Sequence, residues 1–285
     1  MERRTDLLVK LRDMTADDLP QAHALSRKLQ WPHRIEDWDF MLRAGMGIVV
    51  EENGAIVGTI MGWPYGPEVA TLGMVIVAGE KQGAGIGRQL MDAMMARLGD
   101  RTIVLNATTE GLPLYTRLGF TAFGEIRQHQ GAAFSVPIPS LRPNERVRPL
   151  SSSDHDAIVA LDRRACGMDR ASLFAELRKA AHGVVLDRDS RAIGFALFRR
   201  FGRGYVIGPV VAPDAEGAKT LISHWLGSNA GMFSRVDIPG DDDLAAWLDD
   251  LGLPCVGRVT RMARGPLAPP DVDVHTFALA SQALG

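Results

Sequence analysis

The sequence lacks several features that would assign it to a specialised class of protein. Its 285 residues include only two cysteines, Cys166 and Cys255, which suit a reducing compartment better than a disulfide-stapled fold. The opening stretch MERRTDLLVKLRDM has no apolar core like that of a signal peptide, and no apolar run reaches the roughly 18 residues of a membrane span. We therefore expect a cytoplasmic protein with no membrane partner.

Charge of one sign is not in excess either. The formal net charge is −2, with 46% hydrophobic and 23% charged residues, which is typical of a globular protein and gives no reason to expect a nucleic-acid partner. The histidines are scattered, and none stands at helical ligand spacing from another, so we predict no metal site. They are His23, His33, His129, His155, His182, His224 and His275.

The first half of the chain has the pattern of an α/β layer on a mixed sheet. LLVKLRDM is typical of an opening strand, and Thr15 with Asp18 predicts a capping box before a helix. Asn53-Gly54 between two apolar runs predicts a hairpin. We expect one strand, two helices, three antiparallel strands, and then a helix, a strand, a helix and a strand.

The second half repeats elements of the first. GIVVEENGAIVG (47–58) and GVVLDRDSRAIG (183–194) have identical length and bounding glycines, and LYTRLGF (114–120) corresponds to WLDDLGL (247–253). SSSDHDAIVALDRRA predicts a second capping box, from Ser153 to Asp156. Matching spacing in three segments indicates an internal duplication.

The proline-rich stretch from Val136 to Leu150 marks the boundary between the two copies. We therefore predict a first domain over 1–138, a linker over 139–148 and a second domain over 149–265. Apolar spacing in the tail, 266–285, predicts that this segment packs back on a domain.

EKQGAGIGRQL, residues 80–90, carries the clearest chemical signal. A Walker loop would need Lys-Ser/Thr where Arg88-Gln89 stands, and the G-x-G-x-x-G dinucleotide fingerprint is not matched. What remains is a glycine-rich turn before an amphipathic helix. Free backbone N–H groups and the helix dipole make such a turn a cradle for a pyrophosphate, whereas the alternative is a flexible loop.

Two motifs resemble those of the GNAT acetyltransferase superfamily. VIVAGEKQGAGIGRQLM is similar to its acyl-CoA-binding motif, Gln/Arg-x-x-Gly-x-Gly/Ala, through Gln82, Gly85 and Gly87, and LPLYTRLGF resembles its later tyrosine motif. The resemblance covers residues 8–136. In the second half, GRGYVIGPVVAPD and VTRMARG resemble a degenerate copy. The implied fold is α/β: two tandem domains, each a mixed, mostly antiparallel sheet flanked by helices.

The resemblance also implies a cofactor site and an activity. The expected cofactor is acetyl-CoA as co-substrate, and the expected reaction is direct attack by a primary amine on its thioester. Tyr115 would protonate the leaving thiolate, although packing under the sheet is the plain alternative for this residue. The residues expected to bind the cofactor are Val75, Ile76, Val77, Gln82, Gly83, Ala84, Gly85, Ile86, Gly87 and Arg88.

Other parts of the reaction stay open at this level. The general base is not identified: Glu68, Glu110 and His33 are candidates, each also readable as a surface or capping residue. The acceptor amine, the length of the acyl group and the choice between monomer and homodimer also stay open. A non-catalytic acyl-CoA-binding or regulatory protein is the alternative function.

Aromatic and polar residues near the motifs are ambiguous too. Trp31, Trp38 and Trp63 are candidates for an acceptor pocket, with core packing the better prediction for at least two of them. Thr108 and Thr109 stand where the family often has a polar Asn, and Asn106 is out of register.

The second copy lacks the chemistry of the first. Its VAPDAEGAKTL has no alternating glycines, and Leu248 stands where the first copy has Tyr115. We therefore expect the second copy to bind no coenzyme A, and instead to support the first domain or to wall its acceptor pocket.

Overall fold

Strands from both halves join one 13-stranded sheet in the computed structural model, which describes residues 9–139 and 141–285. Leu7 and Leu8, at the start of the predicted opening strand, lie outside the described residues. The strands of the first half are β1 (Val9–Asp13), β2 (Met46–Glu52), β3 (Ala55–Tyr65), β4 (Val69–Val77), β5 (Thr102–Ala107) and β6 (Thr121–Ala132). Those of the second half are β7 (Glu145–Pro149), β8 (Ala181–Arg188), β9 (Arg191–Phe201), β10 (Gly204–Ala212), β11 (Phe233–Pro239), β12 (Cys255–Arg264) and β13 (His275–Ala278).

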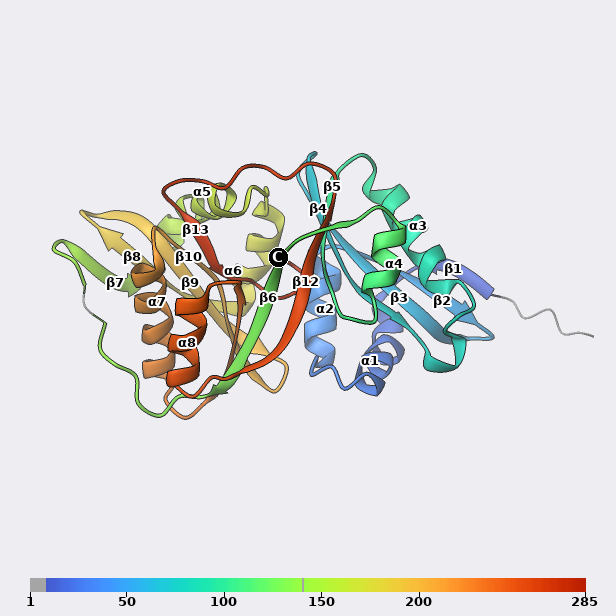
Figure 1. Cartoon of the computed structure of the whole chain (residues 1–285), viewed down its shortest axis with the longest axis horizontal. Helices are drawn as coiled ribbons and strands as arrows, with labels where there is room; N and C mark the ends of the chain where they lie inside the picture. The colour runs from blue at the N-terminus through green and yellow to red at the C-terminus, as the bar shows by residue number, and fades with distance from the viewer. Residues whose placement is uncertain (1–8, 140) are drawn as a thin grey trace, which may run out of the picture.

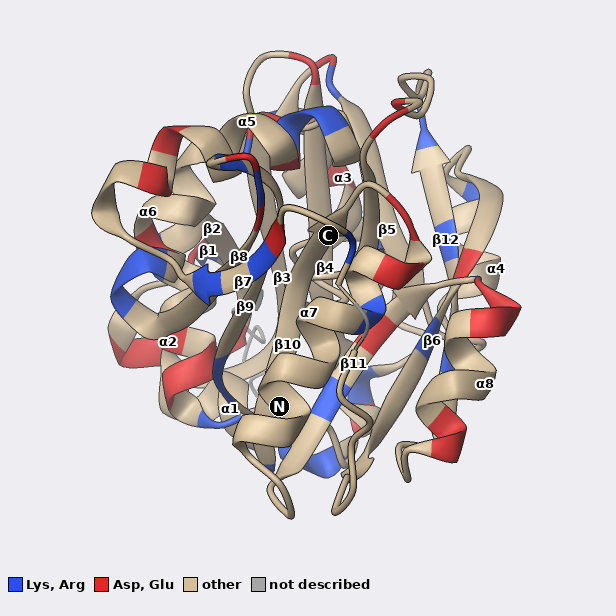
Figure 2. Cartoon of the chain, turned by 90° about the vertical axis from the view of Figure 1, so that its left-hand side faces the viewer, with Lys and Arg blue, Asp and Glu red and all other residues tan. Residues whose placement is uncertain are grey.

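Helices cover both faces of this sheet, as Figure 2 shows: α1, α2, α5 and α6 lie on one side, and α3, α4, α7 and α8 on the other. The α-helices are α1 (Leu19–Lys28), α2 (Ile35–Ala44), α3 (Ile86–Leu98), α4 (Leu112–Arg117), α5 (His155–Cys166), α6 (Ala171–Ala180), α7 (Ala215–Ser228) and α8 (Asp242–Asp250). Short 3₁₀ turns are η1 (Ala16–Asp18), η2 (Gly79–Lys81) and η3 (Ser152–Asp154). The predicted order of elements in the first half and the α/β class are confirmed.

The two halves exchange their last strands. The sheet order is β1-β2-β3-β4-β5-β12-β6-β11-β10-β9-β8-β7, so β12 lies between β5 and β6, and β6 lies between β12 and β11. Figure 1 shows β6 and β12 side by side where the halves meet. The domains predicted over 1–138 and 149–265 are therefore not self-contained, because each needs a strand from the other to complete its sheet.

The duplication is visible in side-chain contacts as well as in topology. Arg12 pairs with Asp18 at 2.7 Å and with Glu51 at 2.8 Å, and Arg148 pairs with Asp154 at 2.7 Å and with Asp187 at 3.0 Å. Each arginine thus ties the first strand of its half to a capping aspartate and to the following hairpin.

The second capping box lies two residues before its predicted position. It joins Ser151 to Asp154, whose carboxylate accepts from the Ser151 N–H at 2.8 Å, so the prediction of Ser153 to Asp156 is wrong. Three consecutive serines leave the register open in the sequence. The ion pair with Arg148, on the preceding strand, selects Asp154.

The linker and the tail are more ordered than their sequences suggest. Glu145–Pro149, at the end of the linker predicted over 139–148, forms β7 and pairs with β8. The tail, 266–285, contributes β13, which pairs with β10, and then crosses toward the first half. There the hydroxyl of Tyr65 donates to the carbonyl of Leu284 at 2.9 Å.

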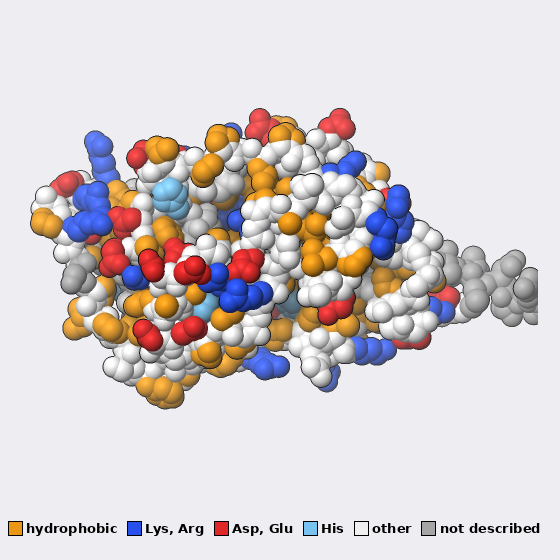
Figure 3. All heavy atoms as spheres, in the orientation of Figure 1, with side chains coloured by type: hydrophobic (Ala, Val, Ile, Leu, Met, Phe, Trp, Pro, Cys, Tyr) orange, Lys and Arg blue, Asp and Glu red, His pale blue; other side chains and the backbone are white. Residues whose placement is uncertain are grey.

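The burial of the tryptophans and the distribution of surface charge also bear on the sequence predictions. Trp38 and Trp63 are fully buried, so core packing is confirmed for these two tryptophans. Among the described residues, no helix combines the length and the apolar character that crossing a bilayer requires. On the face in Figure 3, Lys and Arg side chains lie among Asp and Glu and form no continuous basic surface.

Candidate functional site

Strand β4 is interrupted by a bulge that opens the sheet. Met74 has φ +53°, the register with β3 shifts between Thr59 and Met61, and the Thr59 hydroxyl donates to the Met74 carbonyl at 2.8 Å. β4 pairs with β5 in parallel only from Val69 to Thr71. Beyond that point the two strands separate, so the segment 75–77 has no ladder partner on the β5 side within the described chain.

The glycine stretch between β4 and α3 forms an open turn whose backbone N–H groups are not covered by side chains. Gly83 and Gly85 both have φ +81°, and a Cβ atom added at either meets no heavy atom within 4 Å. The first helical bond of α3 runs from Gln89 N–H to the Gly85 carbonyl at 3.1 Å. Among the described residues, no acceptor takes the N–H groups from Gly83 to Arg88. A run of free donors at a helix N-terminus binds anions.

The side chains of this turn leave the donors uncovered. Ile86 is buried in the core, and a Cβ atom at Gly87 would lie 3.4 Å from Leu114 of α4. Arg88 is exposed and pairs with Asp92 at 3.0 Å. Gln82 is exposed, with its amide nitrogen 3.4 Å from the Val77 carbonyl, and Ala84 is exposed. The turn therefore exposes mainly backbone N–H groups, with the guanidinium of Arg88 at its edge.

Tyr115 lies on α4, close to this turn through its neighbour Leu114. Its ring packs edge-on against Phe120 with centroids 6.1 Å apart, and the side chain is almost completely buried. Within the described residues its hydroxyl makes no hydrogen bond. Burial raises the pKa of Tyr115 to about 12, so the phenol keeps its proton through the neutral range.

The equivalent place in the second half is filled by the chain itself. Asp214 caps α7, and its carboxylate accepts from the Gly217 N–H at 2.9 Å. β13 pairs with β10, and Leu279 N–H donates to the carbonyl of Asp237 on β11 at 2.9 Å, so the tail occupies the gap between these strands. Leu248 is fully buried.

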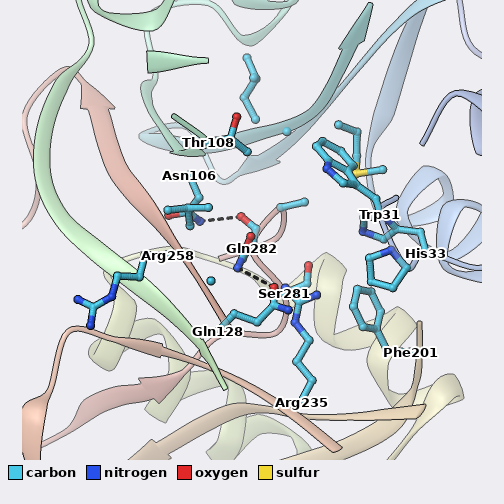
Figure 4. A pocket seen from close by; sticks show the side chains of 17 residues that line it. Trp31, His33, Asn106, Thr108, Gln128, Phe201, Arg235, Arg258, Ser281 and Gln282 are labelled. Carbon is cyan, nitrogen blue, oxygen red and sulfur yellow. Dashed lines mark hydrogen bonds between the residues drawn. The ribbon is translucent and has the colours of Figure 1, made fainter. Parts of the chain in front are cut away.

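A cavity of about 240 Å³ lies where the two halves meet, next to the β4 bulge. Gly73 and Met74 of β4 line it, together with residues of the α1–α2 loop, β5, the second half and the tail (Figure 4). Its polar and aromatic lining comprises Trp31, His33, Asn106, Thr108, Gln128, Phe201, Arg235, Arg258, Ser281 and Gln282.

His33 and Asn106 bring unpartnered polar atoms to this cavity. Nδ1 of His33 and Oδ1 of Asn106 are buried and have no hydrogen-bond partner. Burial, together with the nearby Arg235 guanidinium, lowers the pKa of His33 to about 4, so the imidazole is neutral at pH 7. Asn106 Nδ2 donates to the Gln282 carbonyl at 2.6 Å, which fixes the orientation of the amide.

The other predicted candidates lie away from the cavity lining. Glu68 is exposed in the β3–β4 turn, where its carbonyl accepts from Thr102 N–H at 2.8 Å. Glu110 is exposed just before α4, where a backbone hydrogen bond holds the pKa of its carboxyl below the usual value. Of the three tryptophans, Trp31 lines the cavity.

The sequence predicts that the second copy could wall the acceptor pocket, but it does not identify the residues that do so. Phe201, Arg235 and Gln282 reach the cavity only because the tail and the exchanged strands bring the halves together. The one available signal was the pair Arg235 and Asp237 inside an otherwise apolar strand. Asn106 was set aside as out of register, yet it lines the cavity.

No group of three or more His, Cys, Asp or Glu side chains within 9–139 and 141–285 is arranged to hold a metal ion. The candidate chemistry therefore rests on the backbone turn, on Tyr115 and on the cavity.

The family models and the relatives of this chain all point to one family of proteins. Two family models described as "Acetyltransferase (GNAT) domain" match residues 44–122 and 158–278, together well over half of the chain. An uncharacterized N-acetyltransferase of Bacillus subtilis, YitH, is 29% identical over 237 residues, covering 82% of each protein.

Solved structures share the fold over at least nine-tenths of the chain. A putative acetyltransferase from Pyrococcus horikoshii superposes with a TM-score of 0.79 at 19% identity, covering 100% of this chain and 99% of that one. A tandem GNAT protein from the clavulanic acid biosynthesis pathway superposes with a TM-score of 0.64 at 16% identity, covering 91% of this chain and 100% of that one. The two-unit arrangement is thus shared by a protein described as a tandem of such domains.

Proposed function

Because the chain belongs to the GNAT acetyltransferase family, with one copy of the domain in each half, we propose that it is an acetyl-CoA-dependent N-acetyltransferase with a single working site in its first half. The family makes it an N-acyltransferase. The choice of donor, the use of an amine acceptor and the location of the site are the proposal.

One observation carries the location. Among residues 9–139 and 141–285, the turn at 83–88 leaves consecutive N–H groups without acceptors, and it has open space over Gly83 and Gly85 at the start of a 13-residue helix. A diphosphate accepts hydrogen bonds from such donors, and the helix N-terminus adds roughly half a positive charge. The residues from Gln82 to Arg88 therefore fit the diphosphate of coenzyme A.

The bulged strand fits the rest of the donor. β4 pairs with β5 only from Val69 to Thr71, so the backbone of Val75, Ile76 and Val77 could hydrogen-bond the amides of a pantetheine arm on that side. A backbone N–H beside the bulge would also stabilise negative charge that develops on the thioester oxygen during attack.

Tyr115 suits the role of general acid. Its phenol is protonated at neutral pH because burial raises its pKa, and its free hydroxyl proton is available to a departing thiolate. In the proposed reaction a neutral amine forms the new C–N bond, the C–S bond breaks, and sulfur receives the proton of Tyr115. The tyrosinate regains a proton from water, which also receives the proton lost by the amine.

The second half does not fit coenzyme A. An anionic carboxylate, Asp214, already accepts a hydrogen bond at the start of α7, and β13 lies where the arm would enter. A phosphate there would meet charge repulsion and a blocked gap. We therefore expect one donor molecule per chain.

Calorimetric titration of acetyl-CoA into the full chain tests this site, with Gly85→Val as the variant. Gly99→Val is the matched control, because Gly99 ends the same helix, also has positive φ (+68°) and also has nothing within 4 Å of an added Cβ. We expect about 100-fold weaker binding for Gly85→Val and unchanged binding for Gly99→Val. Equal affinity in both variants would remove the turn from the site, and no thiol release with any amine would remove the transferase activity.

A further inference from the structure

The cavity beside the bulge lies in a region with a surplus of buried positive charge. Arg199 is almost completely buried, and among the described residues it has no carboxylate within ion-pair distance. Its guanidinium lies 4.9 Å from the centroids of both Phe40 and Phe201, and it donates to the Ala280 carbonyl at 3.1 Å. Buried charges are normally paired, so this cation favours an anionic ligand nearby.

Arg235 adds a second positive charge, at the wall of the cavity. It is buried and lines the cavity, and its guanidinium also lies near Phe201, 5.4 Å from the ring centroid. Asp237 accepts from its Nε at 3.0 Å and forms an ion pair with its Nη2 at 2.8 Å, which leaves Nη1 without a partner in the described structure. Two buried carboxylates, Asp37 and Asp237, thus serve three guanidinium groups, because Asp37 pairs with Arg34 at 2.7 Å and Asp237 with Arg235 at 2.8 Å, which leaves Arg199 without an ion-pair partner in the described structure.

Hydrogen-bond acceptors stand on the β5 side of the same cavity. Oδ1 of Asn106 is buried, unpartnered and held in orientation by the bond from Nδ2 to the Gln282 carbonyl. This oxygen can accept an N–H from an amine. Asn106 lies two residues beyond Val104, the last β5 residue paired with β4, so it lies where the two strands have separated.

The tail fixes the spacing between the acceptor and the cation. Gln282 accepts from Asn106 through its backbone, and its side-chain amide is 3.4 Å from Asp237, the partner of Arg235. Figure 4 shows Asn106, Gln282, Gln128 and Arg235 following one another across the cavity, with Trp31, His33 and Phe201 on the other side. The cavity is smaller than the roughly 300 Å³ at which sites for drug-sized ligands begin, since it measures about 240 Å³.

We propose that the acceptor is a small amino acid, whose carboxylate is held by Arg235 and whose amine lies at Asn106 beside the β4 bulge. This inference rests on the proposed transferase function. The amine nitrogen loses one proton to water and forms the C–N bond. The C–S bond breaks, the electron pair stays on sulfur, and the thiolate takes the proton of Tyr115.

Matched substrate pairs test this inference on the unmodified chain. Thiol release from acetyl-CoA is measured with each proteinogenic amino acid and with its decarboxylated amine, for example alanine against ethylamine and serine against ethanolamine. For at least one pair we expect the amino acid to have about 100-fold higher kcat/KM, the scale of losing a charge-assisted hydrogen bond to the carboxylate.

Two arginine variants then locate the carboxylate. Arg235→Met is expected to reduce the preference for the amino acid to less than tenfold. Arg258→Met is the matched control, because Arg258 also lines the cavity but is largely exposed and pairs with Glu125 at 3.0 Å. Near- and far-ultraviolet circular dichroism verify that each variant is folded. If Arg235→Met does not fold, Arg235→Lys replaces it, with a loss of at least tenfold in the same preference expected.

The outcomes separate this inference from the function on which it rests. Equal rates within every pair, or reaction with simple amines alone, overturn the amino-acid assignment and leave an acetyltransferase. An unchanged preference in the folded Arg235 variant overturns the role of Arg235. Absence of thiol release with every amine overturns the inference and the acetyl transfer together, whereas loss of acetyl-CoA binding identifies the proposed donor site as the failure.

Discussion

The two halves share a fold but differ at the N-terminus of one helix. In the first half α3 begins at glycines with positive φ and uncovered N–H groups, whereas in the second half α7 begins with Asp214, whose carboxylate satisfies the Gly217 N–H. The first arrangement leaves an anion site open, and the second fills it with the chain's own anion. A few residues at one turn thus separate a candidate binding site from a structural helix cap.

A second difference reinforces the first. The gap beside β4 leads to a cavity, whereas the gap beside β10 contains β13. The tail makes with β10 the kind of backbone hydrogen bonds that a pantetheine arm would make with β4. The second copy therefore has a structural use: it closes the cavity from the far side, with Phe201 and Arg235.

The largest effect is expected from separating the halves. Expressed alone, residues 1–138 lack β12, which lies between β5 and β6, and the exposed strand edges favour association. We expect no monomer with a cooperative urea transition from this fragment, while the full chain unfolds in a single calorimetric transition. A monomeric, cooperatively folding fragment would show that the exchange is dispensable.

The next largest effect is expected at the tyrosine that only the first copy has. Tyr115→Phe removes the proton donor but keeps the ring, so we expect kcat to fall about 100-fold while the Kd for acetyl-CoA changes less than about threefold. Tyr205→Phe is the control, because Tyr205 stacks on Phe198 in the second half, with ring centroids 4.6 Å apart. Equal kcat values for Tyr115→Phe and the native chain would exclude this role.

A third prediction concerns a feature that the halves share. Hydrogen bonds from Arg12 lower the pKa of Asp18 to about 2, and Arg148 likewise holds the pKa of Asp154 below its usual value. Each carboxylate therefore adds stability that is present above about pH 4 and is lost as the pH falls through its folded pKa.

Asp18→Asn and Asp154→Asn are accordingly expected to lower the free energy of unfolding by similar amounts, about 2 kcal/mol at pH 7, and by less at pH 2. Urea titrations at both pH values measure this difference. A loss that is independent of pH, or confined to one half, would contradict the equivalence of the two ion pairs.

The smallest effect is expected from opening the filled helix start. Asp214→Gly removes an N-cap and an ion pair with Arg142 at 2.7 Å, which should cost about 1 kcal/mol of stability. It should not create a second acetyl-CoA site, because β13 still occupies the gap beside β10. A binding stoichiometry of two in this variant would show that the carboxylate alone silences the second copy.

Local features of this chain were predictable from its sequence, and non-local ones were not. The turn before α3 and the hairpin at Asn53 follow from glycine and asparagine chemistry within a few residues. The second capping box was misplaced because adjacent serines are alike until Arg148 selects a partner.

The candidate site likewise contains residues that are predictable from local sequence and residues that are not. Tyr115 and the glycine turn lie in contiguous motifs, so the sequence reveals them. The strand exchange depends on pairing between β6 and β12, which start more than a hundred positions apart in the chain. Arg235 and Gln282 reach the cavity only through that pairing and through the path of the tail, so no spacing rule could indicate them.

A crystal structure of the full chain grown with saturating acetyl-CoA tests most directly the claim that only the first half binds the donor. We predict one molecule per chain, with its diphosphate on the N–H groups from Gly83 to Arg88 and its arm between β4 and β5. Donor at the start of α7, or none in the first half, would contradict that claim.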